Sequence, residues 1–168
     1  MSVYKEITSD QFELNPFKRI SKDWMLITAE KDGKVNTMTA GWGGLGVMWG
    51  KEVAFIVIRE SRFTKEFVDA ADCFSLTFFE EYYKKELGYL GKVSGRDEDK
   101  ISKSGLTLLK DNAPYFKEGN LAFICKKLYR KDLDKDGFTD NLELDKKWYA
   151  DKDYHTLYIG EIEKILMK

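Results

Sequence analysis

The hydrophobic pattern along the chain is that of short β-strands separated by turns. Trp24–Lys31 and Val35–Gly41 flank Asp32-Gly33, a tight-turn dipeptide, and together they predict a β-hairpin. Val53–Ile58 is continuously apolar, which is typical of a strand covered on both faces.

Three further segments carry strand signals. In Cys73–Phe79 the apolar side chains alternate with Ser75 and Thr77, so that one face of the strand is apolar and the other polar. Leu121–Leu128 and His155–Ile165 are predicted as the last two strands.

Helical periodicity is limited to three short stretches. Apolar residues recur at helical spacing after Ser61, a candidate N-cap, and again in the polar stretch after Cys73–Phe79. Asp97–Ser104 begins with acidic residues and stops at Gly105, which matches helix start and stop signals. The apolar positions of the first two stretches are Phe63, Phe67 and Ala70, and Tyr83, Leu87 and Leu90.

Strands therefore outnumber helices and are joined by turns or by single short helices. This order favours an antiparallel barrel or another α+β fold over a doubly wound parallel sheet. The length of 168 residues, without repeats or a linker-like segment, predicts a single domain over residues 1–168.

Composition narrows the range of functions. The net charge of −1 indicates no global attraction to nucleic acid or to an anionic membrane. The longest apolar run is too short to span a bilayer, and the N-terminus (MSVYKEITSD) has no apolar signal-peptide core. The two cysteines, Cys73 and Cys125, form no C-x-x-C pair, so we expect buried thiols and a cytoplasmic protein. The high aromatic content of 14% fits either a β-rich core or a stacking platform for a planar ligand.

Gly41, Gly43 and Gly46 match the dinucleotide-binding pattern G-x-G-x-x-G. That fingerprint needs a helix to open at its last glycine, whereas Val47–Gly50 leads directly into another strand. A bent strand, or a close approach of backbone to a ligand, explains these glycines better.

Asp132–Glu143 has the spacing of an EF-hand calcium loop. The preceding Ala122–Tyr129 is predicted as a strand rather than the required helix, and Thr139 stands at a normally apolar position. A solvated acidic connection is the preferred interpretation, and calcium binding stays the alternative.

The sequence R-E-S-R-F-T, Arg59–Thr64, lies between a buried strand and a helix start. Two guanidinium groups, two hydroxyls and free helix amides at one junction are the donors that a phosphate monoester needs. A capped helix with solvated arginines explains the same residues equally well.

Two other polar features carry weaker signals. His155 is the only histidine, and such a residue is more often structural than catalytic. No Ser-His-Asp or Cys-His arrangement is indicated, and no transition-metal site is expected. Lys92–Lys100, with its turn at Ser94-Gly95, is by itself a polar loop.

Five blocks in the same order give these segments a family resemblance. The chain resembles the flavin reductase-like family, which includes flavoredoxin and the reductase components of two-component monooxygenases. The blocks are N-T-M-T-A-G-W-G-G-L-G (Asn36–Gly46), V-A-F-I-V-I-R-E-S-R-F-T (Val53–Thr64), F-S-L-T-F-F (Phe74–Phe79), G-K-V-S-G-R-D-E-D-K (Gly91–Lys100) and H-T-L-Y-I-G-E-I (His155–Ile162).

The resemblance implies an FMN-binding split barrel: a six-stranded antiparallel Greek-key barrel with peripheral short helices, usually a homodimer with flavin near the subunit interface. It further implies hydride transfer from NAD(P)H to flavin, or, as the alternative, an FMN electron carrier that accepts electrons from a redox protein. The resemblance implies that the flavin ring and ribityl chain contact Thr37, Met38, Thr39, Ala40 and Trp42. It implies that the phosphate is bound by Arg59, Ser61, Arg62 and Thr64. The loop that covers the flavin would contain Lys92, Ser94 and Gly95. His155 would line the side where nicotinamide docks, and Lys92 would stabilise the reduced flavin.

Overall fold

The computed structural model describes residues 3–168. The first two residues of the domain predicted over 1–168, which also begin the N-terminal stretch MSVYKEITSD, lie outside the described residues. Its strands are β1 (Lys5–Ile7), β2 (Met25–Lys31), β3 (Lys34–Ala40), β4 (Gly43–Met48), β5 (Lys51–Arg59), β6 (Cys73–Phe78), β7 (Leu108–Lys110), β8 (Pro114–Phe116), β9 (Leu121–Asp132) and β10 (His155–Met167). Its α-helices are α1 (Pro16–Lys18), α2 (Phe63–Ala70), α3 (Lys84–Lys92), α4 (Lys100–Ser104) and α5 (Glu143–Trp148).

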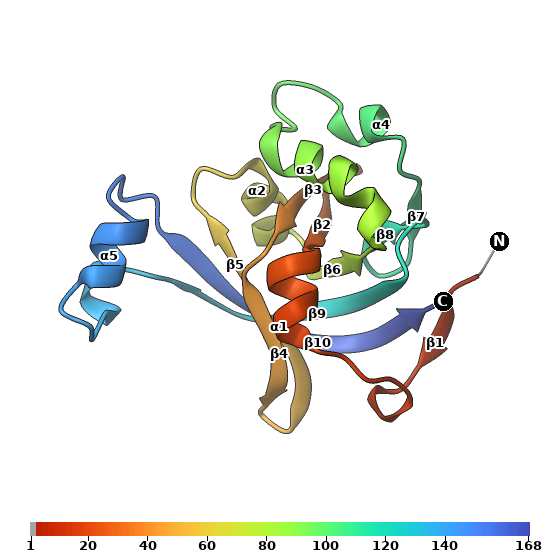
Figure 1. Cartoon of the computed structure of the whole chain (residues 1–168), viewed down its shortest axis with the longest axis horizontal. Coiled ribbons are helices and arrows are strands. Elements are labelled where there is room, and N and C mark those ends of the chain that lie inside the picture. Colours follow the sequence, from red (N-terminus) through yellow and green to blue (C-terminus); the bar gives the residue numbers. More distant parts are fainter. Residues whose placement is uncertain (1–2) are drawn as a thin grey trace.

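Eight strands form one antiparallel sheet in the order β3-β2-β6-β9-β10-β5-β4, with β1 added along β10 (Figure 1). β7 and β8 pair separately. The predicted antiparallel barrel with short helices is confirmed, with more strands than the expected six. The first and last strands in this order, β3 and β4, are joined by only two residues. Both therefore lie close to the site described below.

The predicted first hairpin is confirmed as β2 and β3. Its turn residues Asp32 and Gly33 both adopt left-handed backbone conformations, with φ of 50° and 73°. This is the geometry of a two-residue turn that matches strand twist, and it explains why glycine stands at the second position.

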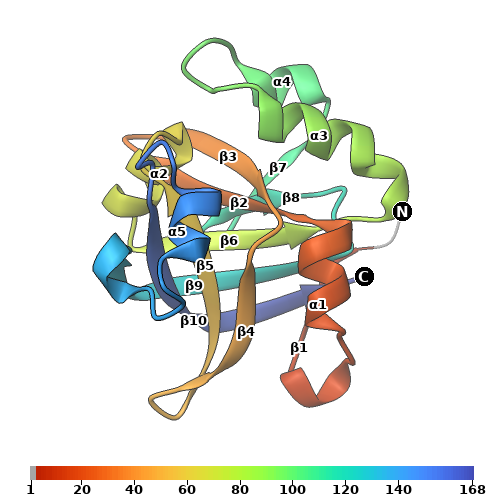
Figure 2. The same ribbon diagram turned by 60° about the vertical axis from the view of Figure 1, so that its left-hand side comes forward.

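The core lies between the strands of the barrel. Phe74 and Phe78 of β6 are fully buried in it, and the Phe78 ring meets Phe123 edge to face at 5.9 Å. The polar face of β6 is buried as well, because β8 covers it and the Ser75 hydroxyl donates to the Pro114 carbonyl at 2.5 Å. A second apolar cluster fixes α3 over β2 through Leu26, Leu87 and Leu90. In Figure 2 α1 lies beside β4, which it also contacts.

Two predicted helix starts are wrong, the first by one residue and the second by three. α2 begins at Phe63, and Arg62 stands at the N-cap position without a side-chain cap, because the Ser61 hydroxyl is bonded elsewhere. α4 begins at Lys100 rather than at residue 97, since the Asp99 side chain caps it by accepting from the Ser102 amide at 3.1 Å. Its predicted end is confirmed: Gly105 has a φ of 73°.

The glycine-rich stretch forms β4 and not a phosphate-binding loop before a helix. Gly43 has a φ of 143°, and a Cβ there would collide with the Phe55 carbonyl oxygen on the neighbouring strand. The glycine is therefore required by close packing of β4 on β5, a reason that the sequence pattern did not predict.

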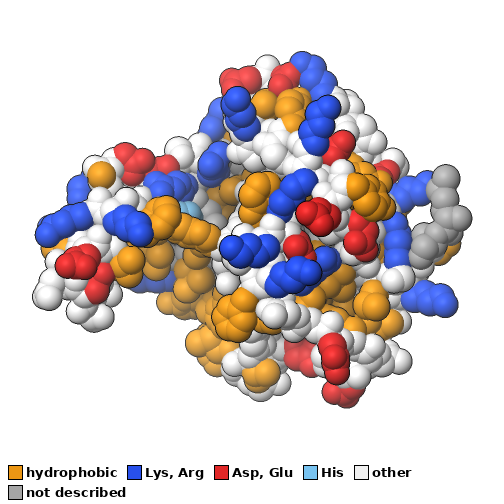
Figure 3. Space-filling view, in the orientation of Figure 1, with side chains coloured by type: hydrophobic (Ala, Val, Ile, Leu, Met, Phe, Trp, Pro, Cys, Tyr) orange, Lys and Arg blue, Asp and Glu red, His pale blue; other side chains and the backbone are white. Residues whose placement is uncertain are grey.

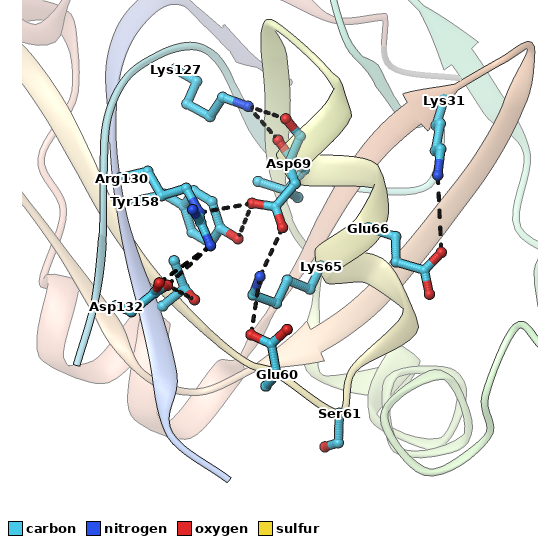
Figure 4. Close-up of polar contacts among 12 residues, drawn as sticks. Lys31, Glu60, Ser61, Lys65, Glu66, Asp69, Lys127, Arg130, Asp132 and Tyr158 are labelled. Atoms are coloured by element: carbon cyan, nitrogen blue, oxygen red, sulfur yellow. Dashed lines mark hydrogen bonds and ion pairs between the residues drawn. The ribbon is translucent and has the colours of Figure 1, made fainter. Parts of the chain in front are cut away.

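A network of charged side chains fixes α2 to the barrel wall (Figure 4). Asp69 accepts hydrogen bonds from the Tyr158 hydroxyl at 2.7 Å and from Lys65 Nζ at 2.8 Å, and it forms an ion pair with Arg130 at 3.1 Å. Lys127 donates to the main-chain carbonyls of Val68 and Asp69, both at 2.7 Å. These contacts connect the end of α2 to β9 and β10.

The segment between β9 and β10 projects from the barrel and carries α5 (Figure 1). Residues 121–132 form a strand, so the stretch with EF-hand spacing is not preceded by a helix. Asp132 ends this strand and accepts from the Thr156 hydroxyl at 2.6 Å. Within residues 3–168 no group of three or more His, Cys, Asp or Glu side chains is arranged to hold a metal ion.

No helix within the described residues has the length and apolar character that a membrane crossing requires.

Candidate functional site

A cavity of about 210 Å³ opens where the end of β3 meets the starts of α2 and β10. In the space-filling view the surface is hollowed between the projecting segment and the barrel, with histidine visible there and apolar side chains below (Figure 3). Its lining consists of Met38, Thr39, Ala40, Gly41, Trp42, Val57, Arg59, Arg62, Trp148 and His155. Six of these, Met38 to Ala40, Trp42, Arg59 and Arg62, are residues predicted to contact the cofactor.

Aromatic rings form one wall of the cavity. Trp42 lies 5.0 Å from Trp148, edge to face at 87°, and 5.1 Å from the ring of His155 at 36°. The wall thus joins residues from the β3–β4 connection, from the end of α5 and from the start of β10. Such rings offer apolar surface for a planar ligand.

His155 is held as a neutral ring. It is a buried residue at the start of β10, paired in register with Arg59, and its Nδ1 lies 2.7 Å from the Tyr149 hydroxyl. Burial, reinforced by the positive charge of Arg59, lowers the pKa of His155 to about 4. At neutral pH the imidazole can therefore donate and accept hydrogen bonds without adding charge to the cavity.

Arg59 is mostly engaged by the projecting segment. Its guanidinium donates to the Trp148 carbonyl at 2.8 Å and to the Asp153 carbonyl at 3.0 Å, and it pairs with Asp151 at 3.4 Å. It also lies 5.3 Å over the Tyr149 ring. These contacts make Arg59 the anchor of residues 148–153, with few donors left for a ligand.

Ser61 and Thr64 do not line the cavity. The Ser61 amide and hydroxyl both donate to the Asp153 carboxylate, at 3.0 and 2.6 Å. Thr64 is buried, and its hydroxyl accepts from the Asn36 side-chain amide at 2.9 Å. The predicted cluster of phosphate donors is therefore divided, and only the arginines reach the cavity.

Arg62 is the most available cation of the cavity. Its guanidinium has five N–H donors but makes one hydrogen bond to the described residues, to the Gly91 carbonyl at 3.3 Å. The same end of α3 is bound by Lys100, whose buried Nζ donates to Leu90 and Val93 carbonyls at 2.8 and 2.9 Å. Burial and then the charge of Arg62 lower the pKa of Lys100 to about 8.

The loop after α3 lies away from the cavity lining. Lys92 is exposed, and the Ser94 hydroxyl accepts from the Arg96 amide at 3.1 Å. Gly95 packs so closely against Asn36 that a Cβ would collide with the amide oxygen of that side chain. The glycine has a packing reason that is independent of any cofactor.

Thr37 also points away from the cavity, since its buried hydroxyl lies 2.9 Å from the Thr28 hydroxyl and donates to the Ile27 carbonyl at 3.0 Å. Sequence reasoning missed Trp148, Tyr149 and Asp153. They lie in a connection whose acidic spacing drew attention to metal binding, and the only available signal was the aromatic pair before the final strand.

The fold and the cavity define the class of protein: an antiparallel split barrel with a pocket of aromatic, arginine and histidine side chains at its edge. The chain belongs to the flavin reductase-like family, since the model of the flavin reductase like domain matches residues 17–168. No curated protein matches the chain.

Three solved structures with related folds show the range of similar proteins. Flavoredoxin from Methanosarcina acetivorans is 23% identical, with a TM-score of 0.66 over 87% of this chain and 68% of that one. An FMN-binding domain of a flavin reductases-like enzyme from Shewanella baltica is 15% identical, with a TM-score of 0.70 over 98% and 76%. An NADH:FAD oxidoreductase from Streptomyces globisporus is 13% identical, with a TM-score of 0.65 over 87% and 74%.

The residues present suit part of a flavin mononucleotide. The aromatic wall and the backbone of residues 39–42 offer a surface for a planar ring, and Arg62 offers unused donors for an anion. The cavity is smaller than the roughly 300–1,000 Å³ of typical small-molecule sites. A second, more apolar hollow of about 390 Å³ shares Gly41 and Trp42 with it, so that Trp42 divides the space at this edge of the barrel.

Proposed function

We propose that this protein binds FMN at the cavity beside Trp42 and passes a hydride from NAD(P)H to the flavin. The observation that carries the proposal is the cavity itself, because it brings six sequence-predicted flavin contacts together in a chain of the flavin reductase-like family. Bound flavin would supply the hydride-accepting chemistry, and the protein would supply position and electrostatics.

The residues have distinct roles in this proposal. The backbone of residues 39–42 supports the ring, Trp42 and Trp148 restrict its movement, and Arg62 binds the phosphate. His155 lines the side of the cavity where the nicotinamide would dock, as a neutral ring that does not repel a cation. Lys92 has no place in the proposal, since it does not line the cavity.

An FMN electron carrier without free-flavin turnover is the second candidate. The fold is shared with flavoredoxins as well as with an NADH:FAD oxidoreductase. The large exposed aromatic surface around Trp42 and Trp148 would also suit contact with a redox protein.

One anaerobic experiment tests the proposal. The purified protein is reconstituted with FMN, freed of excess flavin and mixed with NADH or NADPH, while flavin absorbance is followed. Bleaching by either nicotinamide supports the reductase. Stable FMN binding without bleaching favours the carrier, and failure to bind added FMN would remove both.

A matched pair of variants tests the site. Arg62→Ala should weaken FMN binding about 10–100-fold and riboflavin binding far less, since a charge-assisted contact to the phosphate is lost. Arg59→Ala should instead lower the melting temperature and weaken both ligands together, because Arg59 anchors residues 148–153. Equal losses for FMN and riboflavin in Arg62→Ala would exclude Arg62 as the phosphate contact.

We also propose a homodimer. Val47 and Trp49, at the tip of the β4–β5 hairpin, are 75% and 55% exposed, and Trp49 lies 6.2 Å from the exposed Tyr129. Sedimentation equilibrium should show a dimer, and Trp49→Asp should shift it to a monomer. A wild-type monomer at high concentration would overturn this proposal. We further propose a cytoplasmic location, where the free thiols Cys73 and Cys125 would remain reduced.

A further inference from the structure

We propose that Asp153 is a specificity-determining residue: its carboxylate occupies the anion seat at the β5–α2 junction and excludes a phosphate from it. The seat is defined by the Ser61 amide, the Ser61 hydroxyl and the Arg59 guanidinium. The inference rests on the proposed function in so far as the excluded phosphate is that of a flavin.

The contacts at the seat are those of an anion site with its anion in place. Asp153 Oδ1 accepts from the Ser61 amide at 3.0 Å, and Oδ2 accepts from the Ser61 hydroxyl at 2.6 Å. Oδ2 also lies 3.8 Å from the Arg59 guanidinium. A backbone amide, a hydroxyl and a guanidinium are the donors that a phosphate would use, and here both carboxylate oxygens use them.

The position of Asp153 is fixed from both sides. Its main-chain carbonyl accepts from Arg59 at 3.0 Å, and its amide donates to the Asp151 carboxylate at 3.2 Å. Its side chain is 20% exposed, against 66% for Asp151. The following residues join the seat to β10, since the Glu60 amide donates to the Tyr154 carbonyl at 3.1 Å. The carboxylate is therefore held in the seat by its own backbone.

Two consequences follow for an incoming phosphate. It would meet like charge at Ser61, and it would find no free donor there, so its binding falls to Arg62 on the cavity side. Of the four residues predicted to bind the phosphate, Arg62 alone would then be left to bind it. Discrimination between FMN and riboflavin should then depend on Arg62 alone in the wild type and should increase when Asp153 is removed.

The first test needs no flavin. The Ser61 amide resonance is followed by two-dimensional NMR while inorganic phosphate is added to the wild type, to Asp153→Ala and to Asp151→Ala. We expect a saturable shift in Asp153→Ala only. A similar shift in the wild type, or none in Asp153→Ala, would overturn the proposal; Asp151→Ala controls for loss of an exposed charge beside Arg59.

The second test measures the ratio of riboflavin to FMN dissociation constants. Asp153→Ala should raise this ratio about tenfold, and Asp153→Asn, which keeps the shape but not the charge, should raise it by less. Ser61→Ala should leave the ratio within about twofold in the wild type and lower it about fivefold in the Asp153→Ala background. Such coupling is a readout that a merely structural Asp153 would not produce.

The outcomes separate this inference from the proposed function. If the wild type binds both flavins and the ratio does not respond to Asp153→Ala, the seat is wrong and the flavin site stands. If no flavin binds, the proposed function is wrong, and the phosphate titration alone decides whether Asp153 blocks the seat. Should Asp153→Ala fail to fold, Asp153→Asn carries both measurements.

Discussion

The Tyr149 hydroxyl lies 2.7 Å from Nδ1 of His155, and the two rings meet edge to face at 83° with centroids 5.6 Å apart. This contact occupies one ring nitrogen of His155, the only histidine of the chain. The Trp42 ring packs against the same imidazole. The imidazole is thus fixed between two aromatic side chains, and its burial there determines its protonation state.

We expect His155 to titrate near pH 4 rather than 6.5, because burial and then the charge of Arg59 disfavour the imidazolium. The ring-proton resonance of His155 is unambiguous in a chain with one histidine, and its NMR titration measures the pKa directly. A midpoint near 6.5 would contradict the buried arrangement.

The same pKa predicts how stability depends on pH. The unfolded chain binds a proton at His155 below about pH 6.5 and the folded chain only below about 4, so acidification between these values favours unfolding. This contribution should be at most about 3 kcal/mol and should level off below pH 4. Urea unfolding of wild type and His155→Gln at both pH values isolates it, since the variant should lose only this part of the slope.

Asp69→Asn should destabilise the protein by about 2 kcal/mol, since it leaves Lys65 and Arg130 without their shared carboxylate. Burial opposes ionisation of Asp69, but hydrogen bonds from Lys65 and Tyr158 outweigh it and lower the pKa of that carboxyl. Denaturant unfolding measures the loss.

Lys31→Gln is the matched control, visible in the same close-up (Figure 4). Its ion pair with Glu66 spans 4.0 Å between half-exposed side chains, and we expect a change below about 0.5 kcal/mol. Comparable losses in the two variants would show that the Asp69 network is no more than a surface arrangement.

The strand pattern could be read from the sequence because period-two alternation and the Asp32-Gly33 turn are local signals. Helix starts are predicted less accurately, because a side chain can cap a helix only if it is not hydrogen-bonded to another residue. Ser61 could have capped α2, yet a residue 92 positions later in the chain takes its hydroxyl. Such a long-range competition leaves no mark on local periodicity.

The same limit applies to the candidate site. Arg59 and Arg62 line one cavity with the end of β3. That these segments belong to one site could be proposed from the sequence, because the order of the family blocks indicates it, but their binding of a flavin stays a prediction. Residue types alone did not predict that Arg59 would anchor the projecting segment while Arg62 keeps donors for a ligand. It depends on the projecting segment, whose carbonyls engage Arg59 and leave Arg62 with a single hydrogen bond to the described residues.

Gly95→Ala should destabilise the protein, because the added Cβ would collide with the Asn36 amide oxygen and disturb its bond to Thr64. We expect a loss of about 1–3 kcal/mol. Gly88→Ala is the matched control within α3, where a Cβ meets nothing within 4 Å; it should stabilise by about 0.5–1 kcal/mol. Thermal unfolding of both compares them, and a neutral Gly95→Ala would show that the loop packs loosely.

Trp148→Ala should weaken FMN and riboflavin equally, by about 3–10-fold, because the part of the aromatic wall beside Trp42 is lost while the phosphate contact is untouched. The fold should survive, since the side chain is half-exposed and Arg59 binds only the main-chain carbonyl of this residue. Fluorescence titration with both flavins measures the effect, and Trp148→Phe, which restores an aromatic ring at this position, should recover most of the affinity. If Trp148→Ala bound both flavins as tightly as the wild type, the ring would lie elsewhere along the barrel edge, with the hollow between α1 and β4 as the next site to test.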